Sequence, residues 1–344
     1  MNNRMKLKNK YIIGTHIMFF EIDMVGEQTT SLINAINTVD NPENITIDYY
    51  FNMSEYFEKI DKTQISVSKL KELFNEEIKK LKNTGCKVIS KIYEGDDPIT
   101  MVDYRRDLNY NNCTKYDYVI WGESDMLIPK EIFQALEQIK DYANSQNIHK
   151  FVTTFAIRKM WDNHWKDLEH PDFTDAPYYE SDDERAFKSP HSIRYTMSVD
   201  EMNEINAKSE SFDIRILKQP KFDGSCLILS GDLLKNGVNI PHCMIGHLHE
   251  DTSMMYSAYR IMGSNYIQFV VKNILKVHNR NHPLKRHYAL EMDSDEKLSD
   301  FSKNGKKGKW FDKMRKLVDF NIANYNHNQA RFYTYKDFEE TLNK

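Results

Sequence analysis

The sequence predicts an α/β domain with a doubly wound sheet, and three features indicate this fold class. Stretches with the periodicities of strands and helices alternate between residues 11 and 142. Residues 116–121 (YDYVIW) form an apolar strand of the kind that is buried on both faces of a sheet. The 344 residues, of which 40% are hydrophobic, suffice for one large α/β domain or two small ones. In such a sheet, ligands bind beyond the carboxyl ends of the strands.

The elements of the first half follow in a regular order. The expected strands are residues 11–20, 45–51, 87–93 and 116–121. The expected helices are residues 29–39, 66–82, 98–109 and 129–142. In the second of these helices, Leu70, Phe74, Ile78 and Leu81 recur with a helical period. Pro129 suits the first turn of the last helix, where a backbone N–H would have no partner in any case.

The second half is less regular, and we expect it to give a mixed sheet. Strands are predicted at 151–157 and 225–229, a helix at 253–262, and a mixed apolar segment at 267–277. The polar, acidic stretch 162–189 is typical of a long surface loop with short helices.

Charge and cysteine content exclude several classes of protein. A net charge of -4 excludes a protein held on nucleic acid or membrane by bulk charge. The four cysteines, which lie far apart, fit neither a zinc spacing nor a dense disulfide framework. The segment 11–20 is short, is interrupted by His16 and lacks a small-residue cleavage site, so it does not fit a signal peptide, and no stretch is long and apolar enough for a membrane span. These features predict a soluble protein in the reducing cytoplasm.

The strongest chemical signal is the run Glu123-Ser124-Asp125, which follows directly on the strand at 116–121. In an extended turn, two carboxylates at this spacing can face one cation, and hard cations such as Mg²⁺ or Mn²⁺ take carboxylate and phosphate oxygens together. An acidic surface turn is the other interpretation, and it is about as common.

Three further signals follow along the chain. Gly224 precedes the strand at 225–229 and permits close backbone approach to a ligand, although it also suits an ordinary turn. Glu250-Asp251 lies where a helix begins, so either carboxylate could act as a general base or simply cap the helix. His278 follows an apolar stretch, where a histidine is more often structural than a ligand.

In this order, the four signals resemble the GT-A glycosyltransferases, in particular the inverting group that uses nucleotide-diphosphate sugars. That family has a DxD-type motif after a strand, a glycine before a later strand, an acidic pair opening a helix, and a downstream histidine. Residues 104–109 (YRRDLN) also match the Arg-Asn helix that the family often places ahead of the DxD strand. The resemblance covers about residues 11–278 and implies a Rossmann-like GT-A fold. Two departures are Glu123 as the first acid of the motif and Asn52 where aspartates are usual.

The resemblance also implies roles for these residues. Asp125, with Glu123 and His278, would hold Mn²⁺ or Mg²⁺ on the diphosphate of the donor, a UDP-sugar by preference. Asp251 would be the catalytic base and Glu250 would bind the acceptor, or the two would exchange roles, and the sugar would be transferred with inversion. The donor site would be completed by Thr15, His16, Asn52, Arg105, Arg106 and Gly224. Structural salt bridges suit both arginines equally well, and His16 equally suits a packed core.

The acceptor is left open by the sequence, as are the sugar and the oligomeric state. A saccharide or glycoconjugate hydroxyl is the default, and a hydroxymethylated base of viral (phage) DNA is the alternative. The DNA alternative depends on the basic segment 301–318, which could follow phosphates. A non-catalytic nucleotide-sugar-binding protein and a nucleotidyltransferase are rivals from other classes. The latter would need a glycine-rich, basic phosphate loop near the N-terminus, which the sequence lacks.

The sequence divides into a catalytic domain at 1–290 and a C-terminal extension at 291–344. The extension has an acidic run followed by the basic segment, and it contains too many aromatic residues for a purely disordered tail. We expect it to be mainly helical and to pack on the domain.

Overall fold

The computed structural model describes most of the first 279 residues of the chain. The ranges described are 4–22, 24–53, 66–95, 99–161, 164–168, 197–217, 224–242, 244 and 250–279. The predicted extension at 291–344 and its basic segment lie outside these ranges, as does most of the loop predicted at 162–189.

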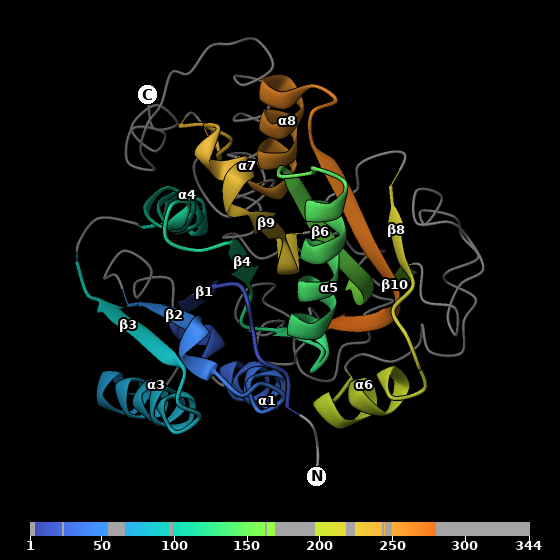
Figure 1. Ribbon diagram of the computed structural model, residues 1–344. Helices are drawn as coiled ribbons and strands as arrows, with labels where there is room; N and C mark the ends of the chain where they lie inside the picture. Colours follow the sequence, from blue (N-terminus) through green and yellow to red (C-terminus); the bar gives the residue numbers. More distant parts are fainter. Residues whose placement is uncertain are drawn as a thin grey trace.

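A single mixed sheet organises the described residues (Figure 1). Its strand order is β3-β2-β1-β4-β9-β6-β10-β5, with β7 paired to β6 and β8 paired to β10. The strands are β1 (Tyr11–Met18), β2 (Ile45–Asn52), β3 (Lys87–Tyr93), β4 (Tyr118–Gly122), β5 (Met126–Leu127), β6 (Phe151–Trp161), β7 (His164–Leu168), β8 (Ile214–Ile216), β9 (Ile228–Ser230) and β10 (Ile267–His278). The first four strands are parallel, whereas β9 runs antiparallel to both of its neighbours.

Helices cover both faces of this sheet, as expected for a doubly wound fold. They are α1 (Val25–Ile36), α3 (Val67–Lys82), α4 (Met101–Asn112), α5 (Ile132–Ser145), α6 (Val199–Asn206), α7 (Gly231–Lys235) and α8 (Glu250–Met262). Short 3-10 turns lie at η1 (Phe19–Glu21), η2 (Pro42–Asn44) and η6 (Gly224–Cys226). The predicted class, a doubly wound mixed α/β sheet, is confirmed.

Two apolar cores lie on opposite faces of the central strands. One packs α1, α3 and α5 against alternate residues such as Ile13 and Ile17 of β1. The other packs α4, α7 and α8 against the intervening residues, including Ile12 of β1 and Trp121 of β4. The alternation follows from the two-residue period of a strand, which sends successive side chains to opposite faces. The second core therefore fixes α4 and α8 beside the end of β4.

Three features of the second half differ from the sequence prediction. Part of the predicted loop at 162–189 is strand β7, which forms a hairpin with β6. The predicted strand at 225–229 begins as the turn η6 and becomes β9 only at Ile228. Helix α6 was not predicted, although Ser198 and Glu201 form a capping box at its start.

Cys86, Cys113 and Cys226 are free thiols. Within the part of the chain that the structure describes, no helix is long and apolar enough to cross a membrane.

Candidate metal and carboxylate site

The acidic motif occupies the turn that connects β4 to β5. The backbone N–H of Met126 donates to the carbonyl of Glu123 at 3.0 Å, which closes the turn. The turn starts from Gly122, where a Cβ atom would lie only 2.4 Å from Oγ1 of Thr15 on the adjacent strand. A glycine is therefore needed for β4 to reach the turn beside β1. Oγ1 of Thr15 also accepts a hydrogen bond from Gln28, at 2.9 Å.

The last residue of β10 is brought to this turn by strand pairing. β5 pairs antiparallel with the end of β10, so that His278 lies opposite Met126. The backbone N–H of Asn279 donates to the carbonyl of Asp125 at 2.8 Å and extends the pairing. Two residues about 150 positions apart in sequence, Asp125 and His278, therefore become neighbours.

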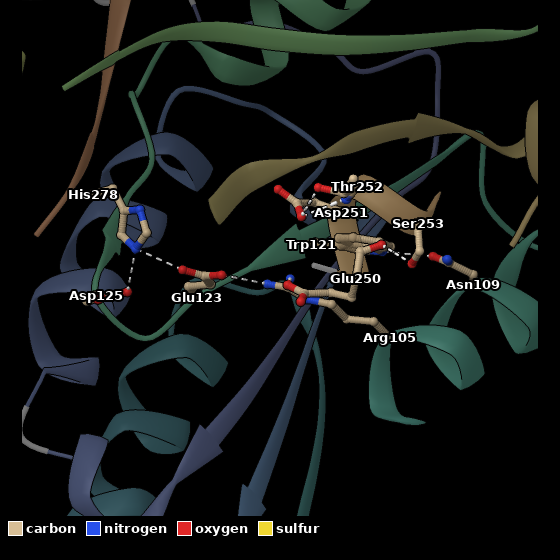
Figure 2. Close-up of polar contacts among 10 residues, drawn as sticks. All are labelled: Arg105, Asn109, Trp121, Glu123, Asp125, Glu250, Asp251, Thr252, Ser253 and His278. Carbon is tan, nitrogen blue, oxygen red and sulfur yellow. Dashed lines mark hydrogen bonds and ion pairs between the residues drawn. The ribbon is translucent and has the colours of Figure 1, made fainter. Parts of the chain in front are cut away.

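Glu123, Asp125 and His278 form a compact cluster of potential metal ligands (Figure 2). Nε2 of His278 lies 2.8 Å from Oε2 of Glu123 and 3.2 Å from Oδ1 of Asp125. One ligand atom from each residue lies within 4.8 Å of the others. Two carboxylate oxygens and an imidazole nitrogen suit Mn²⁺ and also occur around Mg²⁺ and zinc. The cluster thus has the chemistry of a divalent-cation site.

The electrostatics of this cluster follow from burial opposed by close charge pairs. Burial lowers the pKa of His278, but the carboxylates of Asp125 and Glu123 outweigh it and raise the pKa above its usual value. Burial likewise raises the pKa of Glu123, but His278 and Arg105 outweigh it and lower the pKa to about 2. Protonation of His278 and binding of a cation by the same carboxylates therefore oppose each other.

Arg105 of α4 links this cluster to a second pair of carboxylates. Its Nη2 donates to Oε1 of Glu123 at 3.1 Å, and its Nη1 donates to Oε1 of Glu250. The guanidinium carbon also lies 4.8 Å from the centre of the Trp121 ring. Trp121 in turn donates from Nε1 to Oδ1 of Asn109, one helical turn after Arg105. Arg105 is only 1% exposed, so these contacts hold a buried charge.

Glu250 and Asp251 open α8 beside this arginine. Glu250 is 5% exposed, and burial raises its pKa to about 7, although Arg105 opposes the shift. Asp251 is partly exposed, and its Oδ1 accepts the backbone N–H of Thr252 at 2.7 Å. Glu250 is buried and is held by its ion pair with Arg105, whereas Asp251 is partly exposed.

Gly224 lies directly against this pair. A Cβ atom there would lie 3.2 Å from Oε1 of Glu250, 3.3 Å from Cβ of Asp251 and 3.4 Å from Nη1 of Arg105. Each of these contacts would be tighter than is usual for a Cβ atom. The three predicted signals at 123–125, 224 and 250–251 therefore meet at one end of the sheet.

The other predicted donor residues lie near the ends of β1 and β2 or on α4. Nε2 of His16 lies 3.1 Å from Nδ2 of Asn52, and the His16 ring stacks on Tyr50. Arg106 donates to the carbonyls of Ile240, Pro241 and Met244 and pairs with Asp103. The contacts of Arg106 are thus structural, and its part in donor binding, like that of His16 and Asn52, stays a prediction.

Sequence reasoning missed three residues that shape the site. Trp121 and Asn109 support Arg105; the resemblance included the Arg-Asn helix at 104–109, but it assigned no role to Asn109 or Trp121. Lys276 of β10 is fully buried, and its Nζ donates to the carbonyl of Cys226 at 3.3 Å, beside Gly224 in η6. Nothing in the sequence around Lys276 distinguishes it from a surface lysine.

Comparisons with known proteins give limited likeness. The sequence matches no protein-family model and no curated protein. Among solved structures, a glucosyl-3-phosphoglycerate synthase of M. tuberculosis is 11% identical, with 88% of this chain aligned to 83% of that chain at a TM-score of 0.38. A UDP-glucose pyrophosphorylase complexed with UDP-glucose is 7% identical, covering 76% of this chain and 90% of that chain at a TM-score of 0.31. A UTP-bound UGPase from acinetobacter baumannii is 9% identical, covering 87% of this chain and 99% of that chain at a TM-score of 0.34. Likeness at this level does not transfer an activity to this chain.

Proposed function

We propose that this protein is a metal-dependent glycosyltransferase that moves a sugar from a nucleotide-diphosphate donor, a UDP-sugar by preference, to an acceptor hydroxyl. One observation carries the proposal. A cation-type ligand cluster and a separate pair of carboxylates lie together beyond the carboxyl ends of the central strands, where doubly wound sheets bind ligands. The first suits the donor diphosphate, and the second suits deprotonation of the acceptor.

In this proposal, Asp125, Glu123 and His278 hold the cation. A divalent cation there would supply positive charge to the departing diphosphate, a contribution of several kcal/mol in comparable sites. A histidine binds a metal through a nitrogen that carries no proton, so protonation of His278 would oppose binding of the cation. All three proposed protein ligands lie among the described residues, and further ligands would come from the diphosphate itself.

We assign the catalytic base to Asp251 and acceptor binding to Glu250. Oδ1 of Asp251 accepts the backbone N–H and the hydroxyl of Thr252, Oδ2 would take the acceptor hydroxyl, and Asp251 is more exposed than Glu250. As the acceptor oxygen bonds to the anomeric carbon, its proton passes to Asp251. The bond from that carbon to the diphosphate breaks, and its electron pair leaves with the diphosphate. Attack opposite the leaving group inverts the anomeric centre.

The segment after β1 favours this reaction over nucleotidyl transfer. β1 leads directly into η1, whose sequence Phe-Phe-Glu contains neither glycine nor a basic residue. A nucleotidyltransferase would need backbone N–H groups and cations near the N-terminus to hold a triphosphate. The DNA alternative depends on residues 301–318, which lie outside the described ranges, so it stays a prediction.

The first experiment is a thermal-shift panel of UDP-, GDP-, CMP- and dTDP-sugars, with and without Mn²⁺, on the full chain. We expect stabilisation by one nucleotide class that requires Mn²⁺ and is lost in Asp125→Ala. The matched control is Asp141→Ala, because Asp141 is an exposed acid on α5 that pairs with Lys8 at 2.7 Å, away from the site. No shift with any donor would refute the proposal. A shift without turnover on any hydroxyl acceptor, including modified DNA, would favour the non-catalytic binder.

A further inference from the structure

Arg105 contacts both the metal cluster, through Glu123, and the carboxylates of α8, through Glu250. Its partners lie 18 and 145 residues away in sequence, so only the fold brings them together. The Trp121 ring against the guanidinium fixes the plane of the fork. A planar fork with two separate N–H groups can hold two carboxylates at once, which a lysine cannot do with the same geometry.

The two oxygens of Glu123 have different partners. Oε1 accepts from Arg105, and Oε2 faces His278. Arg105 therefore turns Glu123 so that Oε2 points toward Asp125 and His278, where a cation would bind (Figure 2). At the same time the arginine competes with a cation for the negative charge of Glu123. How strongly it competes depends on how much of its own charge Glu250 neutralises.

We propose that Arg105 is a positioning residue that couples occupancy of the Glu123–Asp125–His278 metal site to the carboxylate of Glu250. This inference rests on the proposed function, and it links the metal cluster to the carboxylates of α8. A cation bound to Glu123 weakens the ion pair between Glu123 and Arg105, and the ion pair between Arg105 and Glu250 becomes stronger. Conversely, when the charge of Glu250 is removed, Arg105 pairs with Glu123 alone, and the affinity of the metal site for a cation falls. Such coupling is reciprocal by thermodynamic necessity.

The test is the dissociation constant of Mn²⁺ alone, measured by the paramagnetic resonance signal of free Mn²⁺ on the full chain. Glu250→Gln is expected to weaken binding by about 5-fold or more, the lower end of typical coupling between sites. Adding Arg105→Gln to Glu250→Gln is expected to raise the affinity above that of Glu250→Gln, because the competing positive charge is removed, but not to the wild-type level, because Arg105 no longer orients Glu123. If Arg105 were merely structural, the double variant would bind more weakly than Glu250→Gln.

Two controls separate contact from general charge effects. Arg106→Gln combined with Glu250→Gln removes a neighbouring charge on the same helix, and it should restore nothing because Arg106 contacts carbonyls and Asp103. Equal restoration by this variant would overturn the inference. Glu137→Gln changes a buried glutamate that contacts Asn9 and Tyr11 and should leave Mn²⁺ binding unchanged.

The remaining outcomes are also decisive. Should the glutamine double variant fail to melt cooperatively, Arg105→Met with Glu250→Leu replaces it, because apolar residues often substitute well for a buried ion pair. The same restoration relative to Glu250→Gln is expected. Binding of Mn²⁺ by the wild type without any loss in Glu250→Gln would overturn the coupling and leave the proposed function intact. Absence of Mn²⁺ binding in the wild type would overturn the metal-dependent function itself.

Discussion

Buried carboxylates lie at both ends of the central strands, and their partners differ. Glu137 of α5 lies beside the start of β1. Its Oε1 accepts from the backbone N–H groups of Lys8 and Asn9 and from the hydroxyl of Tyr11, at 2.8 to 3.0 Å. Its Oε2 accepts from Nδ2 of Asn9 at 2.9 Å. Four donors that belong to the fold itself therefore satisfy this one carboxylate.

At the other end, four carboxylates share two cationic side chains. Glu123, Asp125 and Glu250 make ion pairs with either Arg105 or His278, and Asp251 lies next to Glu250. Burial of an ionised group is costly unless donors or opposite charges compensate it. Among the described residues, the partners of Glu137 are hydrogen-bond donors, whereas Glu123, Asp125 and Glu250 face the charged or chargeable side chains of Arg105 and His278. The difference fits a role of Glu137 in the fold and the proposed role of the other end in cation binding.

The largest effect is expected at the end of the sheet that carries Glu123, Asp125 and His278, which we call the metal end. Asp125→Asn removes one ligand charge, and we expect transferase activity to fall about 1000-fold, because metal stabilisation is worth several kcal/mol and each 1.4 kcal/mol is tenfold. Thermal stability without metal should fall little, because His278 keeps its contact with Glu123. Nucleotide release and sugar transfer would both be measured. Activity within about threefold of the wild type would remove Asp125 from the metal site.

The next largest effect is expected at the opposite end of the sheet, where a substitution should lower stability and leave Mn²⁺ binding and activity unchanged. Glu137→Ala leaves the donors of Asn9 and Tyr11 without their acceptor, and we expect a loss of about 3 kcal/mol in the free energy of unfolding, measured in urea. Mn²⁺ binding and activity at a temperature well below the unfolding transition should be unchanged. A change in the Mn²⁺ dissociation constant without a loss of stability would contradict the assignment of Glu137 to the fold.

A third prediction uses pH to separate the carboxylates of the metal end. Since the folded pKa of Glu250 is about 7 and its ordinary value is 4.5, the folded state binds more protons between these values. The contribution of Glu250 to stability therefore falls as the pH rises from about 5 to 8, by on the order of 2 kcal/mol. Glu123, with its pKa lowered to about 2, instead contributes stability above about pH 4.5 that is lost as the pH falls toward 2.

The measurement is urea unfolding of the metal-free protein at several pH values, for the wild type and Glu250→Gln. We expect the difference in stability between the two to change steadily from pH 5 to pH 8 in favour of the variant. A constant difference would mean that Glu250 is already ionised at pH 5. Glu137→Gln, measured alongside, shows how much of the slope belongs to any buried glutamate.

These contrasts also show what the sequence could predict. The strands and helices of the first half follow from apolar periodicity, and the turn at Glu123-Ser124-Asp125 was placed correctly because it follows a buried strand. Pairing between distant segments was not readable in this way. The two-residue strand β5 has no periodicity of its own, yet it brings His278 to Asp125. Arg105 likewise gave no sign of its two carboxylate partners.

The smallest effect is expected from a substitution at Gly224, which tests how closely Glu250 and Arg105 must be positioned. Gly224→Ala places a methyl group 3.2 Å from Oε1 of Glu250 and 3.4 Å from Nη1 of Arg105, so both groups must shift by a few tenths of an ångström. We expect activity to fall by a few-fold, because small misplacements of positioned groups lower rates, with little change in stability. Gly26→Ala is the matched control, since its methyl group would meet only Glu77, at 3.8 Å, and it lies in the first turn of α1. If both variants kept full activity, the ion pair between Arg105 and Glu250 would tolerate displacement, and close positioning at this end of the sheet would matter less than its charge.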